Sequence, residues 1–176
     1  MLSWFVLFAW QAKLIQAGNA ATHQNIGRAA WMLVAVMLIS GLYISFKMMV
    51  EHGNAEVLIA NSFMVVQFLA FFAAALFAIR NNDRESHKRY MVFASLAIIF
   101  PAMGRFTDAF FGNEMLSLPM IIIATVAIPI FYDKHLKQPI HRATKIGISA
   151  SIVWTALLLG AVFSPLGDAI LNLVKN

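Results

Sequence analysis

Residues 57–79 read VLIANSFMVVQFLAFFAAALFAI, an apolar stretch that contains no charged residue. A helix rises about 1.5 Å per residue, so about 20 apolar residues cross the ~30 Å hydrocarbon core of a bilayer. The stretch is long enough for one crossing, and its polar residues Asn61 and Gln67 suit hydrogen bonds between packed helices. It therefore predicts a membrane-spanning helix.

Five further runs of similar character lie on either side of this stretch. The six predicted spans cover residues 1–17, 29–50, 57–79, 90–111, 115–132 and 146–163. They nearly fill the chain and leave no room for a soluble domain, so we expect a single all-α transmembrane bundle over residues 1–176. The first run is thin for a crossing. We expect either a local mismatch with the bilayer or, preferably, a true start upstream of Met1.

The composition agrees with a membrane protein. Of the 176 residues, 61% are hydrophobic and 12% are charged, and the mean hydropathy is +0.76. Soluble domains usually lie near ~45–50% apolar and ~25% charged residues. The lack of cysteine excludes disulfides, thiolate zinc sites, iron–sulfur clusters and cysteine nucleophiles. A glycine-rich phosphate loop and the HExxH and GxSxG motifs are also missing, so the sequence does not indicate an enzyme.

The basic residues gather in alternate connections between the runs. Ten of the thirteen lie where spans one and two, three and four, and five and six are joined: Lys13, Arg28, Arg80, Arg84, Lys88, Arg89, Lys134, Lys137, Arg142 and Lys145. Short loops rich in Lys and Arg remain in the cytoplasm, so we expect both termini to lie on the opposite, non-cytoplasmic side. Topology and anionic headgroups account for the net charge of +5, and no nucleic-acid partner is expected.

A histidine precedes three of the apolar runs. His23, His87 and His141 are each followed within five positions by a basic residue, which indicates three weakly related helical hairpins. The expected topology places all three rings at one membrane face. Gathered there, they could bind a metal ion or supply an axial ligand to haem b. The alternative is that each ring lies in the headgroup layer, where an apolar body with a polar tip is stable.

Two charged residues fall inside the fourth predicted span. An ionisable group in hydrocarbon costs at least ~2.5 kcal/mol, so each needs a physical reason. Arg105 and Asp108 are three positions apart and therefore neighbours on a helix, and we expect them to pair. Pro101 removes a backbone hydrogen bond and should kink the helix. The two charges are either structural or a site for a substrate or ion, as in a small permease or proton-linked carrier.

Three motifs carry a resemblance to a known family. They are His23-Gln-Asn-Ile-Gly27, His87-Lys-Arg-Tyr-Met91 and Pro101-Ala-Met-Gly-Arg105. Over most of its length the chain resembles small bacterial inner-membrane proteins of six or seven helices that carry the motifs HxxxG, HKRxM and PAxxR. The resemblance implies a multi-pass protein of the bacterial inner membrane, and the family has no established activity to carry over. More distantly, the interfacial histidines resemble those of b-type cytochromes, although no two of them lie within predicted helix interiors.

These features favour a non-enzymatic integral membrane protein with an accessory or assembly role. One alternative is a b-type haem or metal-binding membrane protein that uses His23, His87 and His141. The other is a small permease built around Arg105 and Asp108. The expected partners are the lipid bilayer and either another membrane protein or a second copy of the chain.

Overall fold

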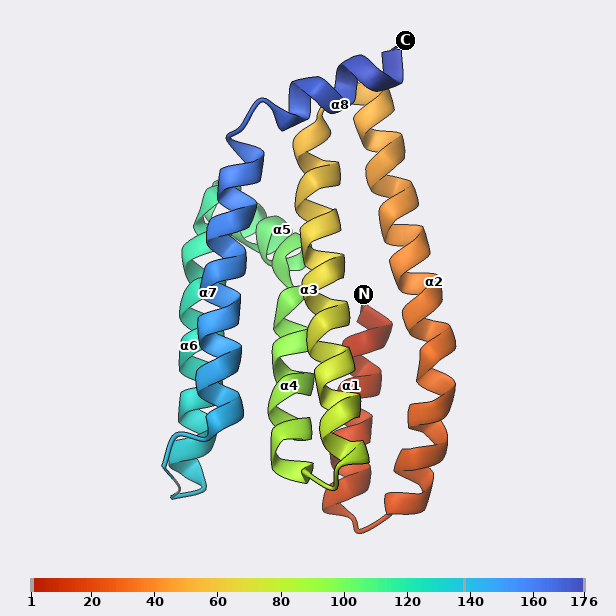
Figure 1. Cartoon of the computed structure of the whole chain (residues 1–176), viewed down its shortest axis with the longest axis vertical. Coiled ribbons are helices and arrows are strands. Elements are labelled where there is room, and N and C mark those ends of the chain that lie inside the picture. Colours follow the sequence, from red (N-terminus) through yellow and green to blue (C-terminus); the bar gives the residue numbers. More distant parts are fainter. Residues whose placement is uncertain (1, 138, 176) are drawn as a thin grey trace.

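In the computed structural model the chain is a bundle of helices (Figure 1). The structure describes residues 2–137 and 139–175, so Met1 of the first predicted span lies outside it. The fold is 88% helical and its described residues contain no strand, which confirms the all-α prediction. The elements are α1 (Leu2–Gln16), α2 (Ala20–His52), α3 (Ala55–Arg80), α4 (Arg84–Ala97), α5 (Phe100–Phe111), the 3-10 turn η1 (Glu114–Leu116), α6 (Ser117–His135), α7 (Arg142–Val162) and α8 (Leu166–Lys175).

Among the described residues, four segments are long and apolar enough to cross a membrane: α2, α3, η1 with α6, and α7. A fifth crossing exists if α4 and α5 count as one span, because together they pass the same test but are bent by 51°. The break lies just before Pro101, the second residue of α5, so the predicted kink is confirmed. The 15 residues of α1 extend about 22 Å, less than the thickness of the hydrocarbon core.

Helix starts differ from the predicted spans at α2 and at α4, which begins at Arg84 rather than near residue 90 and so includes His87, and one helix was not predicted. Helix α2 begins at Ala20 rather than near residue 29, because the Asn19 side chain caps it by accepting a hydrogen bond from the Thr22 amide. His23 therefore lies in the first turn of a helix, not in a connection. Helix α8 follows Pro165 and was not predicted; it crosses the ends of α2 and α3 (Figure 1).

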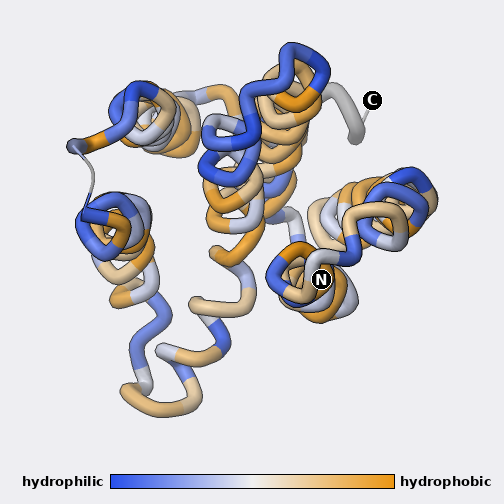
Figure 2. Tube along the Cα trace, turned by 90° about the horizontal axis from the view of Figure 1, so that it is seen from below, coloured by the Kyte–Doolittle hydropathy of each residue, from blue (hydrophilic) through white to orange (hydrophobic). Residues whose placement is uncertain are grey.

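The connections α1–α2, α3–α4 and α6–α7 lie at the same end of the bundle, the lower end in Figure 1. We call it the basic end, since these are the connections that carry ten of the thirteen basic residues. Figure 2 views the molecule from this end and shows hydrophilic segments where helices begin or end and hydrophobic segments along their length. The fold thus contains the alternation of basic and non-basic connections that the sequence indicates.

Aromatic side chains of α3 lie at the centre of the core. Trp4 of α1 packs edge-on against Phe68, with the ring centroids 5.1 Å apart. The Trp4 Nε1 also donates to Oγ of Ser95 in α4 at 3.1 Å, so the short α1 is held by both neighbours. On the other side of α4, Gly147 of α7 lies against the Phe93 ring so closely that a Cβ would overlap it. Helix α7 can reach α4 here only because position 147 has no side chain.

Candidate functional site

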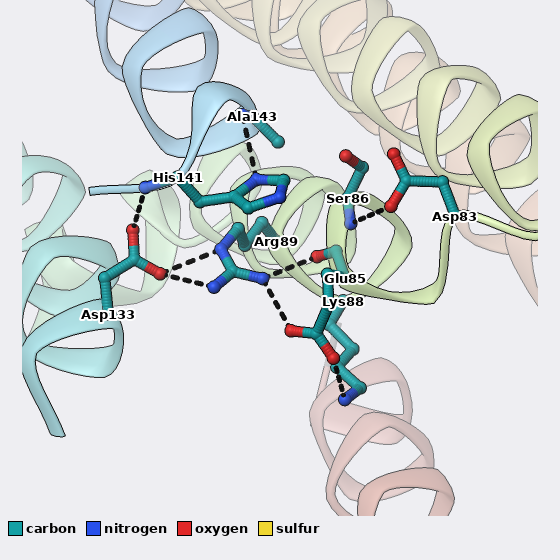
Figure 3. Close-up of polar contacts among 8 residues, drawn as sticks. All are labelled: Asp83, Glu85, Ser86, Lys88, Arg89, Asp133, His141 and Ala143. Carbon is teal, nitrogen blue, oxygen red and sulfur yellow. Dashed lines mark hydrogen bonds and ion pairs between the residues drawn. The ribbon is translucent and has the colours of Figure 1, made fainter. Parts of the chain in front are cut away.

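A buried ion pair joins α4 to α6 at the basic end. The Arg89 side chain is 1% exposed and the Asp133 side chain is 0% exposed. Nε and Nη2 of Arg89 both donate to Oδ1 of Asp133, at 2.8 and 2.6 Å (Figure 3). Removing two charges from water is costly unless the geometry is good and the remaining polar atoms are hydrogen-bonded. The contacts around the pair decide whether this condition is met.

The rest of the Arg89 guanidinium is held from α4 and α6. Nη1 donates to the backbone oxygen and to Oε2 of Glu85, both at 2.8 Å. The Tyr132 ring lies 5.3 Å from the guanidinium carbon, a cation–π contact. Glu85 also accepts a hydrogen bond from Lys88 at 2.7 Å. Arg89 thus makes four hydrogen bonds with five donors, so its charge is well satisfied.

Asp133 extends the contact to the start of α7. Its Oδ2 accepts a hydrogen bond from the His141 backbone amide at 2.9 Å. The His141 ring in turn caps α7, because its Nδ1 accepts from the Ala143 amide at 3.1 Å. We call Glu85, Arg89, Asp133 and His141 the basic-end cluster. Its members satisfy one another, which suits fixing three helices better than binding a ligand.

The local sequence places α4 so that this cluster can form. Asp83 caps the helix by accepting from the Ser86 amide at 2.9 Å. Hydrogen bonds from the Ser86 hydroxyl and amide also hold the pKa of the Asp83 carboxyl below its usual value. With the helix start fixed here, Glu85 and Arg89 lie four residues apart on one face. That face meets Asp133 of α6.

The predicted histidines lie at the basic end but on separate helices. With the Gln11 amide oriented to satisfy its neighbours, its nitrogen donates to Nδ1 of His23 and its oxygen accepts from the Gly27 amide at 3.2 Å. His87 donates from Nδ1 to the backbone oxygen of Ala75 in α3 at 2.8 Å. In the part of the chain that the structure describes, no three His, Asp or Glu side chains gather as a metal site. His23, His87 and His141 therefore share an end of the bundle without forming a three-ligand site.

Arg105 and Asp108 lie elsewhere, on α5. Both are exposed, and their side chains do not form the ion pair that their spacing predicts. Thr107, which lies between them in sequence, is the buried residue of this helix. Arg105 therefore lies on the side of α5 that faces away from Thr107, and Asp108 lies at the edge of that side.

Sequence reasoning missed the pairing of Arg89 with Asp133. The sequence pattern places Arg89 among the basic residues of the connections and does not indicate Asp133 as its partner. One signal was available, since Asp133 is the sole carboxylate between residues 115 and 167 and ends an apolar run. Its partner lies 44 residues away, and nothing in the local pattern identifies it.

Comparison of the chain with protein-family models, with curated proteins and with solved structures found no match.

Proposed function

We propose that the chain is a six-span protein of the bacterial inner membrane, with its basic end in the cytoplasm and both termini on the opposite side. In this proposal α1 and the bent pair α4–α5 complete the six spans. The distribution of exposed residues carries the argument. Met32, Ile39 and Phe77 are 71%, 70% and 70% exposed, whereas Arg89 and Asp133 are buried. An apolar outside around a charged contact is stable in lipid and prone to aggregation in water.

We further propose that the protein acts without catalysis, as an accessory or assembly factor. The basic-end cluster supports this role, because its charged groups are already paired in contacts between helices. A catalytic carboxylate or histidine needs a position open to a substrate. In the cluster, both Asp133 oxygens accept hydrogen bonds from other residues of the chain. Turnover of any substrate by the purified protein would contradict this role.

The topology can be tested by cysteine labelling, since the chain has no native cysteine. Single variants Arg84→Cys and Lys134→Cys report on the basic end, and Glu51→Cys and Glu114→Cys report on the other; all four positions are exposed. We expect an impermeant maleimide to label the second pair in intact cells and the first pair only after the cells are opened.

The same preparation tests the membrane placement itself. The protein should stay with the membranes in alkaline carbonate and dissolve only with detergent. Labelling of positions 84 and 134 from opposite faces, or stability in buffer without detergent, would overturn the proposal.

A second candidate function, b-type haem or metal binding, is favoured by one observation at His87. A carbonyl oxygen can only accept, so the bond to Ala75 places the proton on Nδ1 and leaves a lone pair on Nε2. Metal-binding histidines are commonly oriented in this way, by an N–H that donates to a backbone carbonyl. His23 lies at the same end, so these two rings, with His141 as a third, are the residues to test.

An absorbance spectrum and elemental analysis of detergent-purified protein decide between the two functions. Haem binding predicts a Soret band that His87→Ala and His23→Ala abolish. His52→Ala, at the opposite end, is the matched control and should leave the band unchanged. A colourless, metal-free preparation would remove this candidate.

A further inference from the structure

Helix α5 is joined to the bundle along one side only. Of its 12 residues Thr107 is the buried one, and its packing is against η1 and α6. A helical projection of 100° per residue places Ala102, Arg105 and Ala109 opposite Thr107, with Asp108 at one edge of that side, and all four are exposed. We call these four residues the outer face of α5. It combines two unpaired charges with two small side chains.

The height of α5 in the bundle makes this exposure costly. Figure 1 shows α5 below the level at which α2, α3 and α7 end. If those helices cross a membrane, the outer face of α5 lies inside it rather than in water. An unpaired ionisable group there costs at least ~2.5 kcal/mol, and no described residue forms an ion pair with either charge, so both need partners from outside.

A second copy of the chain would supply both partners. We propose that the outer face of α5 is a homodimer interface, in which Arg105 of each copy pairs with Asp108 of the other. A two-fold interface is self-complementary, so one opposite-charge pair in the sequence gives two ion pairs. Ala102 and Ala109 let the backbones approach, because small residues permit close packing of helices in lipid. This inference rests on the membrane placement proposed above.

The bend between α4 and α5 provides the required geometry. Copies inserted in the same direction can be related only by an axis along the membrane normal. Helices that run parallel to that axis place each residue against its own equivalent, which would bring Arg105 against Arg105. Helix α5 departs by 51° from α4 and is therefore oblique to the axis. The components of the two α5 axes that lie in the membrane plane then point in opposite directions. This arrangement brings residue 105 of one copy near residue 108 of the other.

Crosslinking of a single-cysteine variant in membranes tests the dimer. Ala109→Cys lies beside the proposed axis, and a short bis-maleimide should link two copies of it. Leu157→Cys, on an exposed position of α7, is the matched control and should give little dimer. In the Ala109→Cys background, Arg105→Asp or Asp108→Arg puts like charges opposite each other. Each change should reduce the dimer about tenfold, the equivalent of ~1.4 kcal/mol.

The double variant Arg105→Asp/Asp108→Arg restores opposite charges across the axis, so crosslinking should return. Misfolding of a single variant cannot produce that rescue. Failure of the double variant to recover, or single variants that crosslink normally, would overturn the proposal. A crosslink from position 109 to a different protein, lost when Arg105 is replaced, would also overturn it, because another partner would then cover this face. The labelling at positions 84 and 134 tests the membrane placement separately, so a correct topology without crosslinks would reject the dimer alone.

Discussion

Two arginines, 16 residues apart along the α4–α5 segment, have opposite surroundings. Arg89 is buried and bound to Asp133 of another helix. Arg105 is exposed and has its nearest sequence partner, Asp108, on the same helix without contact. A charged side chain that is hydrogen-bonded within the chain helps to hold the helices together. An exposed charged side chain without an ion pair is available to a molecule outside the chain. The difference separates a structural role from an interaction role.

The largest expected effect comes from removing one member of the buried pair. Asp133→Ala removes the buried partner of Arg89 and leaves only the partly exposed Glu85 carboxylate beside the charge. Breaking a buried pair typically costs 3–5 kcal/mol, so a loss of stability near the lower end, about 3 kcal/mol, is expected. Thermal unfolding in detergent measures it. The double variant Arg89→Met/Asp133→Leu removes both charges and should recover much of the loss. Equal instability of the single and double variants would contradict the charge explanation.

A smaller effect is expected where α7 meets α4. Gly147→Ala places a methyl group on the Phe93 ring, and overpacking of this kind costs about 1–3 kcal/mol. Gly160→Ala in the same helix is the matched control, since no atom lies within 4 Å of its Cβ position. It should be neutral or slightly stabilising, by up to about 1 kcal/mol of helix propensity. If both variants unfold at the same temperature, α7 does not approach α4 as described.

The Thr144 hydroxyl offers a test in the opposite direction. Thr144 is fully buried in the first turn of α7, and no described residue meets its Oγ1 in hydrogen-bonding geometry. An unsatisfied buried polar group costs about 1–3 kcal/mol, so Thr144→Val, which keeps the shape, should stabilise the protein by about 1 kcal/mol. A lower unfolding temperature for this variant would instead identify the nearby Asp133 carboxylate as a partner of the hydroxyl.

The smallest effect on stability is expected at the exposed charge. Arg105→Gln should change the unfolding free energy of the monomer by less than about 0.5 kcal/mol, as for most surface substitutions. Unfolding in detergent at a dilution that separates the copies measures this value. A loss as large as that of Asp133→Ala would remove the contrast between the two arginines.

Much of the fold follows from apolar runs and turn chemistry. The runs at 57–79 and 146–163 match α3 and α7 closely, and Pro101 marks the break. The start of α2 does not follow from the apolar run, because the helix is capped by Asn19 and begins before that run does. A short helix such as α8 contributes too few residues to form an apolar run.

The candidate site was only partly predictable, since its contacts join distant parts of the chain. The shared end of His23, His87 and His141 follows from topology alone. Whether Arg89 meets Asp133 depends on how α4 packs against α6, which local spacing does not encode. The charges at 105 and 108 were identified because they interrupt an apolar run, but their orientation on α5 required the fold.

The position of the Arg89–Asp133 pair also bears on biosynthesis. Arg89 emerges from the ribosome 44 residues before Asp133, so the ion pair cannot form until α6 has been synthesised. In the topology proposed above, the basic end lies in the cytoplasm, so Arg89 stays in water or among headgroups and neither charge has to be carried through hydrocarbon to meet the other. Closure of the pair then becomes a late step, which docks the α6–α7 hairpin onto helices that are already inserted.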